Sequence, residues 1–184
     1  HAEARDHLRS VENHIVELYE QGEVNNLRVL KQTLWDFERF YQAIEPHHRQ
    51  HARAMLHILR LLFALSFEIK LGRLNAGQIR GRKDHWITAM MNSNEDAPIK
   101  SSFERYKGID LSDTTLSDEL LIELLVNGVI DELLIKRDLD SSAWFLEPAD
   151  EPSWRTIWHR FERDDGAVVE AIGMLQRELA KLQY

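Results

Sequence analysis

Residues 25–37, with the sequence NNLRVLKQTLWDF, decide how the rest of the chain is interpreted. Apolar side chains recur in this stretch and just beyond it at alternating spacings of three and four, which places them on one face of a helix. That face consists of Leu27, Leu30, Leu34, Phe37, Tyr41 and Ile44. Gly22 can end a preceding helix, and a side-chain oxygen of Asn25 or Asn26 can cap the new one. The stretch therefore predicts an amphipathic helix with a defined beginning.

Arg28 falls in the first turn of this helix, away from the expected buried face. The N-terminus of a helix carries partial positive charge, so a cation at this position is mildly unfavourable by itself. An anionic group close to Arg28 would remove that cost. Arg28 is therefore a candidate anion-binding residue.

Composition excludes several classes of protein and site. The 184 residues suffice for a compact domain with a sizeable core, and 43% hydrophobic with 29% charged residues argues against general disorder. The net charge of −8 argues against a global nucleic-acid-binding surface. The absence of cysteine excludes disulfides, thiolate metal sites and cysteine nucleophiles, and it is compatible with the cytoplasm. The longest apolar run, residues 61–67, is far shorter than the roughly 18 residues of a membrane span, so no membrane partner is expected.

The first 71 residues read as three helices joined by short connections. Helical spacing predicts one helix over residues 3–20, and the stretch quoted above forms the second. Pro46 suits the first turn of a third helix that runs to about Leu71, and its segment 58–67 is apolar on most sides. We expect residues 1–71 to form an antiparallel helical unit with this third helix at its centre.

Residues 72–116 differ in character, because residues 72–83 are rich in glycine and in basic side chains. We expect an irregular basic loop region here, with a short helix or a two-strand ribbon as alternatives. Clustered cations on a glycine-containing backbone suit phosphate or nucleic-acid contacts, while a solvated loop that balances an acidic protein is the competing interpretation. The candidate contacts are Arg73, Arg80, Arg82 and Lys83.

Helical signals return in residues 117–184. Ser117 followed by two acids predicts a helix beginning there, and Gly128 is expected to break or kink it. Further helices are expected over residues 129–139, with Ile130, Leu133 and Leu134 facing inward, and over residues 154–161 and 168–182. The predicted fold is mainly α, a multi-helix bundle with an irregular central excursion. Residues 117–184 are expected to pack on residues 1–71.

No complete catalytic or metal site is predicted. The P-loop pattern G-x-x-x-x-G-K-[ST] is absent, since Gly77 is followed by Gln78. The histidine-rich segment 47–57 lacks the glutamate of an H-E-x-x-H zinc site and is interpreted as exposed polar residues. Arg9 and His14 have the R-x4-H spacing of HEPN-type ribonucleases, as do Arg80 and His85, but about two such matches are expected by chance in this composition.

Residues 26–30, Asn-Leu-Arg-Val-Leu, continuing to Leu34, resemble the sensor-2 helix of AAA+ ATPases with the pattern N-[ILV]-R-x-L, and the corresponding helix of KAP-type P-loop ATPases. In those families the helix belongs to a small helical lid, and its arginine points at the nucleotide phosphates. Arg28 occupies that position. The general character of the remaining sequence, including residues 154–158, resembles that of C-terminal extensions of bacterial defence ATPases.

The resemblance implies that this chain is the lid and C-terminal region of a longer prokaryotic P-loop ATPase, with a role in anti-phage defence. ATP and Mg²⁺ would be bound by an N-terminal core outside this chain and not by the chain alone, which would itself lack enzymatic activity. A homo-oligomer in the cytoplasm and a protein effector partner are further implications. The alternatives are a helical protein–protein interaction module without a nucleotide role and an HEPN-like ribonuclease that uses Arg9 and His14.

Overall fold

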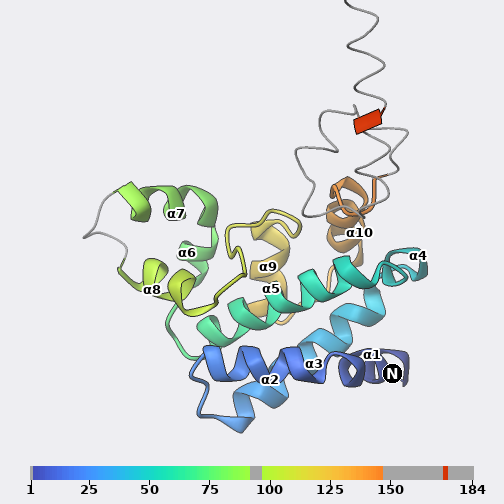
Figure 1. Cartoon of the computed structure of the whole chain (residues 1–184), viewed down its shortest axis with the longest axis horizontal. Helices are drawn as coiled ribbons and strands as arrows, with labels where there is room; N and C mark the ends of the chain where they lie inside the picture. The colour runs from blue at the N-terminus through green and yellow to red at the C-terminus, as the bar shows by residue number, and fades with distance from the viewer. Residues whose placement is uncertain (1, 92–96, 147–171, 174–184) are drawn as a thin grey trace, which may run out of the picture. The chain divides into compact units, whose positions relative to one another are not determined.

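The computed structural model describes residues 2–91, 97–146 and 172–173, which form helices and turns with no strand among them (Figure 1). The mainly α fold predicted from the sequence is therefore confirmed. The chain divides into two compact units, residues 1–136 and 137–184, and the helix α10 crosses this boundary. The bounds of the helices are α1 Ala2–Ser10, α2 Glu12–Gln21, α3 Leu27–Ala43, α4 Pro46–Arg49, α5 Ala52–Lys70, α6 Ala76–Ile79, α7 Arg82–Met91, α8 Ala97–Arg105, α9 Asp118–Leu125 and α10 Glu132–Ser141.

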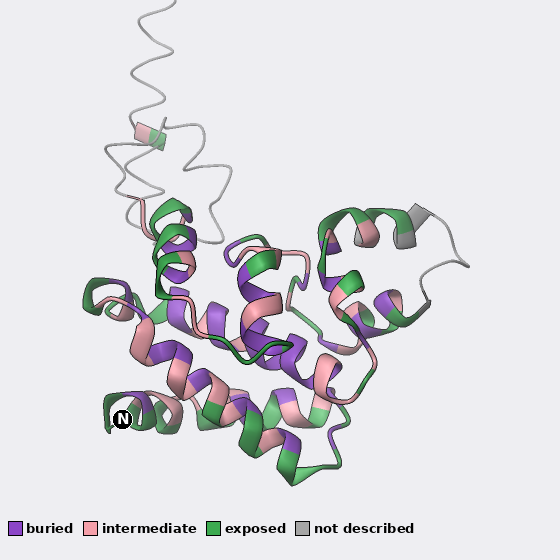
Figure 2. Ribbon diagram, turned by 180° about the vertical axis from the view of Figure 1, so that it is seen from behind, coloured by how far each residue is buried: buried purple, intermediate pink, exposed green. Residues whose placement is uncertain are grey.

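Helix α5 is the centre of the first unit, as its apolar sequence predicts. It contacts α2, α3, α4 and α9, and every residue from Leu61 to Glu68 is buried (Figure 2). Phe63 packs edge-on against Phe37 of α3 and against Phe67, with ring centroids 5.7 and 5.9 Å apart. Interlocking aromatic rings of this kind give the α3–α5 pair a fixed geometry.

The buried face of α3 is rotated from the one that its leucines predict. It consists of Val29, Thr33, Phe37, Phe40 and Tyr41, followed by Ile44 just beyond the helix. Leu27 is 66% exposed, so its predicted place in the core is wrong. The polar residue on the buried face is accommodated because the hydroxyls of Thr33 and Ser66 form a hydrogen bond of 2.8 Å across the α3–α5 contact.

Two helices predicted as continuous are each divided in the structure. Val11, with φ −115° and ψ 17°, separates α1 from α2. His51, with φ −81° and ψ 82°, separates the short α4 from α5. Neither break has a proline or glycine at the division, so the sequence carries no breaker signal at either place.

The central region 72–116 contains α6, α7 and α8 in place of the alternative two-strand ribbon. A capping box explains where α6 begins, because Asn75 Oδ1 accepts from Gln78 N while Gln78 Oε1 accepts from Asn75 N. Gly81, with φ +74°, makes the turn into α7. Helix α7 contacts α8, and α6 contacts α9. Turns precede α6 and follow α8.

The predicted cap of α9 is confirmed, since Ser117 Oγ accepts a hydrogen bond from Leu120 N. Gly128, with φ +69°, lies in the turn between α9, which ends at Leu125, and α10, which begins at Glu132. Leu133 is 80% exposed, so its predicted inward orientation is wrong. The predicted helix 154–161 and most of the predicted helix 168–182 lie outside the described residues. Among the helices that the structure describes, none combines the length and the apolarity needed to cross a membrane.

Candidate functional site

The N-terminus of α3 presents Arg28 to solvent. Asn26 Oδ1 accepts a hydrogen bond of 2.9 Å from Arg28 N, which caps the helix and fixes the backbone at this position. The first turn contains no acidic side chain. Among the described residues, no group forms a hydrogen bond or an ion pair with the exposed Arg28 guanidinium. A capped helix end thus carries a cation whose donors remain available to an external anion.

The four candidate cations of residues 72–83 do not form a common patch. Arg80 and Lys83 are exposed. Arg73 turns inward, where Nη1 donates hydrogen bonds to Gly22 O at 2.7 Å and to Glu68 Oε1 at 3.1 Å. Arg82 is only 3% exposed. The structure therefore uses Arg73 and Arg82 to bind other parts of the first unit, and a phosphate would have to displace those protein acceptors.

Arg82 organises the segment that connects α8 to α9. Its guanidinium donates to Leu111 O at 2.9 Å, to Leu116 O at 2.8 Å, to Asp113 O and to the Asp118 carboxylate. Burial lowers the pKa of Arg82, while the nearby carboxylates of Asp118, Asp113 and Asp110 oppose that shift. A single buried side chain thus satisfies carbonyl groups of a turn-rich segment that has no helix or strand to bond them.

A buried carboxylate cluster at Glu68 was not predicted from the sequence. The Glu68 side chain is fully buried and accepts hydrogen bonds from Arg105 Nη1 at 2.7 Å, Ser102 Oγ at 2.6 Å, Tyr106 Oη at 2.9 Å and Arg73 Nη1. These donors come from α8, from Tyr106 directly after it and from the turn after α5, so Glu68 connects these segments to the central helix. Two guanidinium groups supply the countercharge that a buried carboxylate requires.

Tyr106 lies between this cluster and the end of α2. Burial raises the pKa of Tyr106 well above its usual range, and the charge and hydrogen bond of Glu68 act in the same direction. A Cβ atom on Gly22 would stand 2.8 Å from Tyr106 Oη and 3.0 Å from Leu18 O. Glycine is therefore needed at position 22 because a side chain there would collide with these atoms. The backbone conformation is not the reason, since a φ of −70° is open to any residue. With its hydroxyl held as a neutral donor and enclosed by protein, Tyr106 has a structural role.

The interpretation of the histidine-rich segment 47–57 as exposed polar residues is wrong for His48. His47 is exposed and His48 is buried, and their ring centroids lie 3.8 Å apart. Glu45 offers a carboxylate near both, but its oxygens accept from Lys136 Nζ at 2.7 and 2.8 Å. A metal ion at this carboxylate would have to compete with that ammonium group. The three residues therefore make a poor cation site.

His57 lies apart from the other histidines and pairs with Asp113. Its Nε2 is 3.4 Å from Asp113 Oδ1. Burial works to raise the pKa of Asp113, but the adjacent His57 ring and the hydrogen bond from Thr115 N outweigh it and leave the pKa lowered. This pair fixes the connecting segment to α5 beside the Arg82 contacts.

Arg9 and His14 are on different helices, with the break at Val11 between them. Arg9 Nη1 contacts Asp6 at 3.5 Å, and His14 Nδ1 lies 3.8 Å from Glu17. Each side chain thus interacts with a carboxylate of its own helix. This arrangement gives no support to a joint role on a scissile phosphate.

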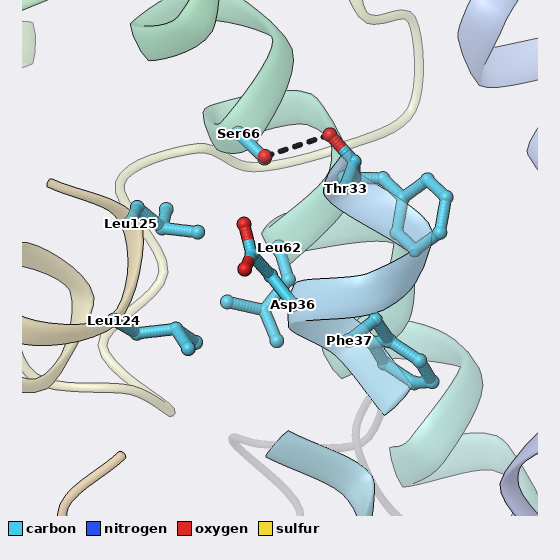
Figure 3. Close-up of a pocket in the computed structure, with 8 residues that line it drawn as sticks. Thr33, Asp36, Phe37, Leu62, Ser66, Leu124 and Leu125 are labelled. Carbon is cyan, nitrogen blue, oxygen red and sulfur yellow. Dashed lines mark hydrogen bonds between the residues drawn. The ribbon is translucent and has the colours of Figure 1, made fainter. Parts of the chain in front are cut away.

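A small pocket lies where α3, α5 and α9 meet (Figure 3). It has room for about one water molecule, with a volume of about 10 Å³. Asp36, whose carboxylate accepts from Lys70 Nζ at 2.8 Å, and the hydroxyl pair of Thr33 and Ser66 provide its polar atoms. The remaining lining is apolar and includes Leu62, Leu124 and Leu125. A pocket of this size cannot hold a nucleotide or another organic substrate.

Comparison with protein-family models, with curated proteins and with solved structures found no match for this chain. The interpretation of Arg28 as an anion-binding residue therefore rests on the geometry at the N-terminus of α3 and on the short sequence resemblance of residues 26–34.

Proposed function

We propose that residues 1–71 form the helical lid of a P-loop ATPase and that Arg28 contacts the phosphates of a nucleotide bound by residues outside this chain. The observation that carries the proposal is the exposed Arg28 guanidinium at a capped helix N-terminus, with no partner among the described residues. Both the guanidinium and the backbone end of α3 favour negative charge. The residues present thus fit a phosphate contact.

The attachment of α3 to α5 also supports a lid function. A lid that responds to nucleotide must move as one body, so its sensing residue has to be on an element that does not shift independently. The packing of Phe37 against Phe63 and the buried hydrogen bond between Thr33 and Ser66 join α3 to the central helix. A displacement of Arg28 would therefore be transmitted to the centre of the unit.

The proposal assigns the cofactors to the core and not to this chain. ATP with Mg²⁺, bound by that core, would supply the phosphoryl-transfer chemistry, and Arg28 would supply a fixed positive charge. By the same resemblance we place the protein in the cytoplasm, in a homo-oligomer with a role in anti-phage defence and with a protein effector as a further partner.

Turnover by the intact ATPase tests the role of Arg28. We expect Arg28→Ala to lower ATP turnover at saturating ATP by about tenfold or more, because a charge that stabilises the transition state is lost. Lys31→Ala, one turn further along the exposed side of α3, is the matched control and should leave turnover close to that of the parent protein. Unchanged turnover in Arg28→Ala, with circular dichroism showing an intact fold, would refute the sensor role.

A second candidate function is a helical interaction module with no nucleotide role. Trp35 and Leu27 favour it, because they are 64% and 66% exposed on the helix that presents Arg28. Large apolar side chains of this kind are characteristic of binding surfaces when they occur together. The two candidates are separated by the sequence upstream of His1 in the gene, where the ATPase proposal requires a Walker A lysine.

A further inference from the structure

Helix α3 carries a ridge made of the exposed Leu27, Lys31 and Trp35 and the partly exposed Arg39, which are spaced four residues apart. Side chains at this spacing form one continuous row along a helix, and such rows fit into the grooves of another helix. From Leu27 to Trp35 the row extends over about 12 Å, given the rise per residue of an α-helix. The α3 ridge thus has the form of a helix-docking element.

The ridge is continuous with the turn after α9, defined here as residues 126–129. Arg39 Nη2 donates a hydrogen bond of 3.0 Å to Gly128 O, and the Arg39 guanidinium lies over the Trp35 ring at 5.9 Å from its centroid. Val126 and Val129 on this turn are 44% and 48% exposed. Backbone hydrogen bonds from Val126 N to Ile122 O and from Val129 N to Glu123 O hold the turn against α9. Apolar side chains from two segments therefore flank one arginine on a well-defined surface.

The charged side chains on this surface indicate which sign of charge a partner should carry. Lys31 is exposed, and no described residue forms a hydrogen bond or an ion pair with its ammonium group. The ridge itself contains no carboxylate. Arg39 already pairs with Asp36, with Nη1 and Oδ1 3.9 Å apart, so Lys31 is the ridge cation that a partner would meet. In a chain with a net charge of −8, this places that cation between two large exposed apolar side chains. Electrostatic complementarity then favours a partner that is acidic next to its apolar residues.

We propose that the α3 ridge and the turn after α9 bind an acidic amphipathic helix of a partner protein, whose apolar residues cover Leu27 and Trp35 and whose carboxylates pair with Lys31. The inference rests on the interaction-module function named above and does not depend on nucleotide contact by Arg28. Nucleic acid fits the surface less well. Arg39 lies over the Trp35 ring, where a base would stack, and the acidic chain repels a polyanion.

Peptide selection on the full chain tests the proposal. The probe is a phage-displayed library of helical peptides of about 20 residues with one randomised face, long enough to form helices in water. We expect enriched peptides to combine apolar residues at spacings of three and four with a net negative charge. Neutral or basic peptides, or no enrichment, would overturn the proposal.

Variants then locate the binding of an enriched peptide. Trp35→Ser should weaken it by about thirtyfold, the effect of losing an anchor residue. Lys31→Glu should weaken it by about tenfold or more, because it places like charges together. Ile87→Ser, which replaces an exposed apolar residue of α7, is the control and should bind as the parent chain does.

The variants also distinguish the proposal from its alternatives. All of these positions are exposed, so circular dichroism should show the parent fold, and Leu27→Ser provides a second test of the ridge. Retained peptide binding in both Trp35→Ser and Leu27→Ser would overturn the proposal. Trp35-dependent binding of a labelled oligo(dT) strand in place of peptides would also overturn it and would indicate nucleic acid. Neither outcome bears on ATP turnover in Arg28→Ala.

Discussion

Tyr106 Oη donates a hydrogen bond of 2.9 Å to Glu68 Oε1, which joins the residue after α8 to the buried C-terminal end of α5. Glu68 also accepts from Arg73, Ser102 and Arg105 and has no exposed surface. Its negative charge is therefore balanced by two guanidinium groups and by hydroxyl donors. Glu68 is therefore one attachment of the region between α5 and α9, beside the contacts of Arg82 and the pairing of His57 with Asp113.

We expect Glu68→Gln to lower the free energy of unfolding by about 3–5 kcal/mol, the usual cost of removing one partner from a buried ion pair. An amide presents one oxygen in place of two and leaves Arg73 and Arg105 without countercharge. Urea denaturation followed by circular dichroism measures the change. Glu104→Gln, at an exposed position of α8, is the matched control. An equal effect in the two variants would contradict the role given to Glu68.

The Tyr106 hydroxyl also lies close to Gly22, which predicts that substitutions at these two positions have coupled effects on stability. A Cβ at position 22 would stand 2.8 Å from Tyr106 Oη, so Gly22→Ala should destabilise the protein by about 1–3 kcal/mol through overpacking. Tyr106→Phe removes the atom that the new methyl group would meet, although Leu18 O remains close at 3.0 Å. The double variant should therefore be more stable than the sum of the two single effects predicts. Strict additivity in urea denaturation would show that the approach of Gly22 to Tyr106 is not the constraint.

The central helix and the beginnings of α3 and α9 were predictable because local signals and burial agree there. The apolar segment 58–67 gave the central helix, and Asn26 and Ser117 cap helices as their residue types predict. The rotation of α3 was not predictable. Its core face includes Thr33, whose burial depends on a partner hydroxyl at Ser66, 33 residues away in sequence.

The Glu68 cluster could be foreseen only in part. Its donors lie 34 to 38 residues away on α8 or follow α5 in a turn, and no periodic pattern relates them to Glu68. The available signal was a single carboxylate at the end of a nearly unbroken apolar run, since a charge in a helix that is apolar on most sides must be paired when it is buried. The inward orientation of Arg73 and Arg82 had no such signal, because their acceptors are mostly backbone carbonyls.

His7 makes the stability of the protein depend on pH. Its ring stacks on Tyr41 and Phe37 with centroids 5.0 and 6.1 Å apart, and within the described part of the chain its buried Nε2 has no hydrogen-bond partner. Burial lowers the pKa of His7 from its ordinary value of 6.5. The charges of Glu3 and Arg49 act on Tyr41, and these two side chains pair with each other at 2.8 Å.

Because the folded state favours neutral His7, its contribution to stability is complete above the unfolded pKa of 6.5 and is lost as the pH falls below it. We expect His7→Phe to reduce the loss of unfolding free energy between about pH 7.5 and pH 5.5, since phenylalanine stacks without binding a proton. Urea denaturation at both pH values measures it. The same pH dependence in His7→Phe and in the parent protein would exclude His7 as its source.

The final prediction concerns the segment between α8 and α9, which Arg82 holds through several acceptors. Lysine keeps the charge but cannot reach Leu111 O, Leu116 O and the Asp118 carboxylate together, because it has one ammonium group in place of a planar fork. We therefore expect Arg82→Lys to cost about 2–3 kcal/mol of unfolding free energy, the scale of lost hydrogen bonds to a charged donor. Arg80→Lys is the matched control two residues away, where the side chain is exposed and the change should be close to zero. Hydrogen exchange should also speed up at residues 111–118 in Arg82→Lys alone, because their fixed positions depend on this guanidinium. Unchanged exchange there, with unchanged stability, would mean that the segment is held by its own turns and by the pairing of Asp113 with His57.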